Sequence, residues 1–150
     1  MFCESIATPA GWLTAYANHV GLTRVEWAEA PASKANAHTQ AAVQQLADYF
    51  AGKCQTFQVP YTLQGTEFQR KVWQAVAGVP YGTVQTYGEI AQLAGVNPRA
   101  ARAVGAAVGA NKLAVFIPCH RVVGAGGKLT GYTGGEGLKT KAYLLALEQK

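Results

Sequence analysis

The chain has 150 residues, of which 49% are apolar and 14% charged, so it can form a real core and long disorder is excluded. No apolar run reaches the roughly 18 residues of a membrane span, and the N-terminus lacks the pattern of a signal peptide. Cys3, Cys54 and Cys119 are an odd, scattered set, which argues against a disulfide framework. We therefore expect a reduced, cytoplasmic protein with no metal site and no cofactor.

Charge is unevenly distributed along the chain. Residues 1–64 carry three Lys and Arg against four Asp and Glu, a net charge of −1, whereas residues 65–150 carry ten against four, a net charge of +6. The basic half is a candidate surface for a polyanion such as nucleic acid, although a merely soluble basic surface has the same charge. We place a domain boundary near Gly65, giving domains 1–64 and 65–150.

The first half predicts strands followed by a helix. Residues 11–17 and 22–28 are β-rich, and the Asn and Gly between them are typical of a hairpin turn. A helix is expected over residues 39–50, ending near Gly52. Its apolar face is predicted from the i, i+3, i+4, i+7 spacing of Val43, Leu46, Ala47 and Phe50.

The second half begins with helix signals. Thr66 and Gln69 form a capping box before a helix whose apolar face carries Phe68, Val72 and Val76. Thr86 and Glu89 form a second capping box before a short helix that stops at Gly95. Its apolar face is predicted as Ile90, Leu93 and Ala94.

Asn97 and Pro98 then start a third helix that runs to about Ala110. Two short helices joined by a turn with glycine predict a helix-turn-helix. The third helix is almost all Ala, Gly and Val, with Arg99 and Arg102 as its only long polar side chains. It either packs closely in the core or approaches DNA closely, placing one arginine and reading no sequence.

The segment 113–117 predicts a short buried strand that Pro118 ends. Cys119 and His120 follow it, and a neighbouring imidazole can accept the proton of a thiol. Glu148 is the best carboxylate to orient the imidazole, because it lies in the last turn of a helix, where the dipole disfavours it without a partner. An inert buried cysteine is the rival interpretation.

Two further segments flank this cysteine. Residues 124–137 contain seven glycines in fourteen positions, a loop that can close over a ligand or be only a flexible turn. The last helix, from residue 138, is predicted to place Leu138, Ala142 and Leu145 on one side.

Residues 117–122, with the sequence IPCHRV, resemble the signature of the O6-alkylguanine-DNA alkyltransferases. The segments PYGTVQTYGEIAQLAG and NPRAARAVGAA before it and GYTGG after it stand in family order, so the resemblance covers residues 66–150 strongly and the first half more loosely. It implies an α+β protein, with an N-terminal ribonuclease-H-like α/β domain and a C-terminal helical winged-helix, helix-turn-helix DNA-binding domain.

The implied activity is direct DNA repair. The family transfers the alkyl group of O6-alkylguanine, and to a lesser extent O4-alkylthymine, irreversibly to its own cysteine. It binds double-stranded DNA in the minor groove and flips the damaged nucleotide out of the stack. The thioether product is stable, so each molecule acts once, and we expect a monomer without a cofactor or membrane association.

The resemblance also assigns roles to residues. Cys119 is the expected alkyl acceptor, His120 its base through a water, Glu148 the orienter of His120, and Asn111 the brace of the active-site turn. Tyr87, Tyr132 and Thr133 are the expected substrate contacts. Arg102 is the expected finger that fills the gap in the stack. The other expected DNA contacts are Gln69, Asn97, Ala100, Ala101, Ala103, Gly105 and Arg121.

The chain departs from the family pattern in three places. Lys112 follows Asn111 where many relatives have proline, Thr133 replaces serine or alanine, and the segment between Tyr132 and Glu148 is two residues longer than expected.

Three other functions compete with alkyl transfer. An alkyltransferase-like binding protein would lack Cys119, a winged-helix regulator would need a base-reading helix, and a cysteine hydrolase would need no helix-turn-helix.

Overall fold

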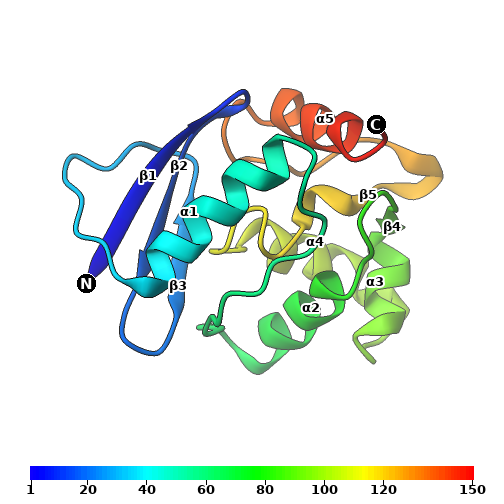
Figure 1. The fold of residues 1–150 in the computed structure, drawn as a ribbon. Helices are drawn as coiled ribbons and strands as arrows, with labels where there is room; N and C mark the ends of the chain where they lie inside the picture. Colours follow the sequence, from blue (N-terminus) through cyan, green and yellow to red (C-terminus); the bar gives the residue numbers. More distant parts are fainter.

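The computed structural model describes residues 1–150 and shows a mixed α+β protein (Figure 1). A three-stranded sheet, β1 (Phe2–Thr8), β2 (Gly11–Ala17) and β3 (Leu22–Glu26), is packed against helix α1 (Ala37–Phe50). The second half contains helices α2 (Glu67–Ala77), α3 (Tyr87–Leu93), α4 (Ala101–Gly109) and α5 (Leu138–Leu147). It also contains a short parallel pair of strands, β4 (Gln85–Thr86) and β5 (Val122–Val123). The predicted α+β class is confirmed. No helix is long and apolar enough to cross a bilayer.

The sheet is an antiparallel meander in the order β1-β2-β3. The expected hairpin joins β2 to β3, with Thr14 opposite Glu26 and Ala15 opposite Val25. Asn18 shapes the turn, because its side-chain oxygen accepts hydrogen bonds from the backbone N–H groups of Val20 and Gly21. One face of β2 buries Leu13, Ala15 and Ala17. Thr14 on the opposite face is buried as well, and its hydroxyl donates to the Ala28 carbonyl.

Helix α1 ends at Phe50 with Ala51 as its C-cap, and Gly52 follows with φ +77°, so the predicted end near Gly52 is confirmed. Its buried face is different from the predicted one, because it consists of Thr39, Ala42, Leu46 and Tyr49, and Ala47 is exposed. Tyr49 is fully buried because its hydroxyl has a hydrogen-bond partner inside the protein. The apolar spacing alone gave Tyr49 no reason to lie in the core.

The helix-turn-helix is present in the second half. Both capping boxes form, Thr66 with Gln69 and Thr86 with Glu89. Asn97 accepts a hydrogen bond from the backbone N–H of Arg99, and a single 3-10 turn (Pro98–Ala100) leads into α4. Trp73 on α2 donates its indole N–H to the Ala107 carbonyl at 2.8 Å, which holds α4 against α2.

The buried face of α3 is not the predicted one. Ile90 and Ala91 are buried, but Leu93 is 61% exposed. The helix is only seven residues long, so the face turned toward α2 and α4 is narrower than the apolar positions suggest. An exposed leucine on the surface is ordinary and requires no partner.

The predicted strand at 113–117 is wrong. Only Leu113 makes a bridge, to Val25 of β3, and residues 114–116 form a turn. Val115 has φ +68°, a left-handed conformation that a β-branched residue rarely adopts. Val115 is nevertheless buried, and the hydrogen bonds around this turn hold it in place. A continuous apolar run therefore folds as a tight turn that leads to Cys119.

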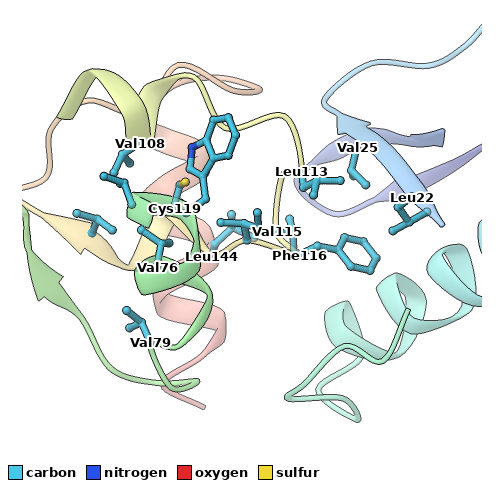
Figure 2. Packing of buried hydrophobic residues seen from close by; sticks show 14 of the residues in the cluster. Leu22, Val25, Val76, Val79, Val108, Leu113, Val115, Phe116, Cys119 and Leu144 are labelled. Atoms are coloured by element: carbon cyan, nitrogen blue, oxygen red, sulfur yellow. The ribbon is translucent and has the colours of Figure 1, made fainter. Parts of the chain in front are cut away.

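Apolar residues from both halves of the chain form one buried cluster. Figure 2 shows Leu22 and Val25 of the sheet beside Leu113 and Phe116, with Cys119 and Leu144 further along the same core. Helix α5 contributes Thr140, Lys141, Leu144 and Leu147, not the predicted face, and Leu138 is 47% exposed. The buried face of α5 includes Lys141, and a pattern of apolar residues cannot predict a face that contains a lysine. The boundary at Gly65 stays a prediction.

Candidate active site

Cys119 begins a one-turn 3-10 helix (Cys119–Arg121) and is only 5% exposed. Asn111 organises the turn in front of it. Its amide donates to the carbonyl of Ile117 at 2.9 Å, and its side-chain oxygen accepts from the backbone N–H of Leu113 at 2.9 Å. These bonds close the strained turn at Val115 and fix the backbone on which the thiol lies.

His120 and Glu148 form a buried pair behind Cys119. The imidazole Nε2 lies 2.7 Å from Glu148 Oε2, and both side chains are inaccessible to solvent. Because a carboxylate only accepts hydrogen bonds, Nε2 carries the proton of a neutral ring and Nδ1 is its free acceptor. Nδ1 has no hydrogen-bond partner in the protein. The two additional residues before Glu148 therefore do not displace it from His120.

The carboxylate of Glu148 also binds residues that sequence reasoning placed elsewhere or missed. Tyr49 of α1 donates its hydroxyl to Oε2, and Arg121 donates Nε to Oε1 at 2.8 Å and Nη2 to Oε2 at 3.0 Å. Arg121 donates Nη1 to the Val79 carbonyl as well. Arg121 is 6% exposed. Its prediction as a DNA contact is wrong, because the buried Glu148 needs a cation and Arg121 supplies it.

Burial decides the protonation states of this cluster. Desolvation raises the pKa of the Cys119 thiol to about 12, although the Asn111 side chain and the charge of Lys141 oppose this. Desolvation also lowers the pKa of His120, more than its bond to Glu148 raises it. Burial would raise the pKa of Glu148, but hydrogen bonds from His120 and Arg121 outweigh it and lower that pKa. At neutral pH the site holds a thiol, a neutral imidazole and a carboxylate.

A cavity of about 740 Å³ opens at Cys119. Asn111, Tyr132 and Thr133 line it, so the structure brings these three predicted residues together with the cysteine. Glycines 131, 134 and 135 of the same loop line it too. Trp27, just after β3, reaches the cavity from the first half of the chain and donates its indole N–H to the Tyr132 hydroxyl at 2.9 Å.

Tyr87 lies beside this loop, outside the lining of the cavity. Its hydroxyl donates to the Thr130 carbonyl at 3.1 Å, and a Cβ on Gly131 would lie 2.6 Å from it. Lys141 of α5 donates to the carbonyls of Val122 and Thr130, which ties the glycine loop to the segment after Cys119. Desolvation lowers the pKa of Lys141 to about 8.

The predicted DNA contacts, Arg121 excepted, are all at least partly exposed. Asn97, Arg102 and Ala103 are exposed, and Ala100, Ala101 and Gly105 are partly exposed. The opposite face of α4 buries Val104, Ala107 and Val108. Gln69 is partly exposed and its side-chain oxygen accepts from the Thr66 N–H in the capping box. The core-packing interpretation therefore holds for the buried face of α4, and the approach of its exposed face to DNA stays a prediction.

Sequence reasoning missed Trp27, Tyr49 and Lys141. Trp27 and Tyr49 lie in the first half, 92 and 70 positions before Cys119 (119 − 27 and 119 − 49), and no motif connects them to it. For Lys141 a signal existed, because a lysine three residues before Leu144 lies on the same face as the buried leucine.

Comparison with known proteins decides the family. Residues 67–150 match the model of the 6-O-methylguanine DNA methyltransferase family, DNA binding domain. The chain belongs to this family. A methylated-DNA–protein-cysteine methyltransferase of Mycolicibacterium paratuberculosis is 51% identical over 128 residues, covering 85% of this chain and 73% of the relative. One of the same name from Methanosarcina barkeri is 41% identical and covers 99% of this chain and 98% of its own length.

Solved structures extend the likeness to the whole chain. The crystal structure of Mycobacterium tuberculosis OGT in complex with DNA has a TM-score of 0.90 and 44% identity, covering 99% of this chain and 93% of the other. An O6-methylguanine DNA methyltransferase from Methanococcus jannaschii has a TM-score of 0.68 at 27% identity, covering 97% and 93%. The two-domain alkyltransferase fold that the resemblance implies is therefore confirmed.

Proposed function

We propose that this protein repairs O6-alkylguanine, and less readily O4-alkylthymine, in duplex DNA by moving the alkyl group to Cys119. The observation that carries the proposal is a thiol in the lining of a cavity, next to a buried imidazole–carboxylate pair. The names of the relatives, methylated-DNA–protein-cysteine methyltransferases, support it. A cysteine hydrolase would form a thioester that water cleaves, whereas alkyl transfer to sulfur leaves a thioether that water does not cleave.

The chemistry is a single in-line displacement. The Cys119 proton passes to Nδ1 of His120 through a water, and the sulfur attacks the alkyl carbon. The C–S bond forms as the C–O6 bond breaks, and the electron pair stays on guanine. Glu148 holds the imidazolium that forms, as the third member of a nucleophile–base–orienter set. The thioether persists, so each molecule acts once. The step needs no cofactor and no second copy of the chain.

Access to a base in a duplex requires that the nucleotide leave the stack. Arg102, exposed on α4, would enter the gap, and the small residues around it would let the helix lie close to the minor groove. Tyr87 would assist rotation of the nucleotide and serve the departing guanine. Tyr132 and Thr133 would receive the base. The exposed lysines and arginines of residues 65–150, which exclude the buried Arg121 and Lys141, would contact phosphates and give salt-dependent affinity without sequence preference.

The test is the intact mass of the protein after mixing with a duplex that carries one O6-methylguanine. We expect one added methyl group per molecule, located on Cys119 by peptide mapping. Cys119→Ala should gain no mass and still bind the damaged duplex, because the thiol contributes little to the DNA surface. Binding without any mass increase in the unmodified protein would instead identify a lesion-recognition protein.

A further inference from the structure

Trp27 forms a contact between the first half of the chain and the proposed substrate cavity. β3 ends at Glu26, and Trp27 follows it directly. Its indole N–H donates to the hydroxyl of Tyr132 at 2.9 Å, across 105 positions of sequence. The side chain is half-buried and packs against the apolar core, so the core holds the donor in place. Tyr132 therefore receives its orientation from outside residues 65–150.

The loop lies directly on the indole. A Cβ at Gly134 would be 2.5 Å from Cδ1 of Trp27 and 2.9 Å from its Nε1. These ring atoms belong to a rigid, packed side chain that cannot move aside cheaply. Gly134 is consequently required by close approach, and Trp27 contacts two positions of the loop, 132 and 134.

The loop needs such contacts because of its composition. Seven of the fourteen residues at 124–137 are glycine, and glycine loses more conformational freedom than other residues when it is ordered. Tyr87 and Lys141 hold the loop at Thr130. Trp27 is the anchor on the other side, where Tyr132, Gly134 and Cys119 line the cavity together with it.

We infer that Trp27 is a positioning and specificity-determining residue that restricts alkyl transfer toward small O6 substituents. This inference rests on the proposed function. With Tyr132 fixed by the indole, the loop stays at one distance from Cys119 and confines a methyl group for in-line attack. When that bond is lost, the loop moves outward and a methyl group loses its orientation. An aromatic O6 substituent suffers less, because its own apolar area contacts the enlarged cavity.

Trp27→Phe tests the inference, since it removes the N–H donor and keeps an aromatic ring. The rate constant of transfer is measured on two duplexes that differ only in one lesion, O6-methylguanine or O6-benzylguanine. A hydrogen bond of ~1 kcal/mol corresponds to about a fivefold lower rate with the methyl lesion. The rate with the benzyl lesion should change by less than about twofold. Trp12→Phe, on the 43% exposed Trp12 of β2, is the matched control and should change neither rate.

Tyr132→Phe removes the acceptor of the same bond without altering the indole, so it guards against a folding defect in the first variant. It should shift the ratio of the two rates in the same direction, and the double variant should lose no more than either single one. Equal losses on both lesions, or independent losses that multiply, would overturn the inference and leave Trp27 a structural residue. Failure of the unaltered protein to transfer from either duplex would instead overturn the proposed function, and with it this role.

Discussion

Glu148→Gln probes the buried network behind Cys119, because the amide keeps the shape of the carboxylate and removes its charge. Oε1 accepts from Arg121 Nε, and Oε2 accepts from His120 Nε2, Arg121 Nη2 and the Tyr49 hydroxyl. A glutamine has one acceptor oxygen and one NH₂ group. Either orientation places an N–H donor against at least one donor of Arg121 and leaves the guanidinium without its counter-charge.

The expected loss follows from this geometry. Removing one partner of a buried ion pair costs ~3–5 kcal/mol, because the other charge stays buried and uncompensated. Domains of this size unfold with about 5–15 kcal/mol, so the variant should be folded but fragile. The free energy of unfolding falls by about 2 kcal/mol per molar urea, so this loss should lower the urea concentration at the unfolding midpoint by about 1.5–2.5 M at neutral pH. The measurement is urea unfolding of both proteins between pH 3 and pH 8.

The pH dependence gives the sharper test. The pKa of Glu148 is lowered in the folded state, so its stabilisation is fully present above the unfolded pKa of about 4.3 and is lost as pH falls below it. The difference in free energy of unfolding between the two proteins should therefore narrow in acid. Two results would refute the assignment of an ionised, buried Glu148. One is a loss of free energy of unfolding in Glu148→Gln of under about 1 kcal/mol at neutral pH. The other is a loss that stays constant down to pH 3.

Three further predictions concern the helix-turn-helix and the glycine loop. Arg102→Ala should slow transfer from a duplex more than transfer from free O6-benzylguanine, and equal losses would contradict its role in DNA. Gly131→Ala should lower the free energy of unfolding by ~1–2 kcal/mol and with it the melting temperature, since φ is +74° and the new Cβ would meet Tyr87. An unchanged Tm would contradict this. The folded pKa of Lys141 is lowered to about 8, so its unfolded form binds more protons above that pH and stability rises toward pH 10. Urea unfolding from pH 7 to pH 10 should show this rise in the free energy of unfolding for the unaltered protein and not for Lys141→Met. The same pH dependence in both proteins would contradict it.

Local chemistry made part of this fold predictable. The capping boxes at Thr66 and Thr86 and the Asn97 cap depend on a few neighbouring residues, and all three form. The Asn and Gly of the hairpin turn act equally locally. Cys119, His120 and Glu148 could be grouped because chemistry requires a base and an orienter beside a nucleophile, and the structure brings Glu148 to His120.

Tertiary partners explain what the sequence could not show. Arg121 resembles a phosphate contact until Glu148 is seen buried beside it. Tyr49 and Lys141 lie in the core because a carboxylate and two carbonyls receive their polar ends. The turn at Val115 contradicts local preference, and its position is determined by Asn111 and by the pairing of Leu113 with β3. The errors at Arg121, Tyr49, Lys141 and Val115 thus reflect polar contacts that apolar periodicity does not encode.

The protonation states bear on how a single-use nucleophile is protected. A buried thiol with a pKa near 12 is protonated at rest, and a neutral His120 with a lowered pKa is a weak base. Neither pKa favours a thiolate at rest, so in the proposed reaction the proton leaves as the C–S bond forms and not before. Glu148 contributes at that moment, because its charge stabilises the imidazolium only once it appears. A protein that is consumed by one reaction gains from this arrangement, since oxidants and other electrophiles react with the thiolate. The burial that slows the resting cysteine therefore also reserves it for a substrate that fits the cavity.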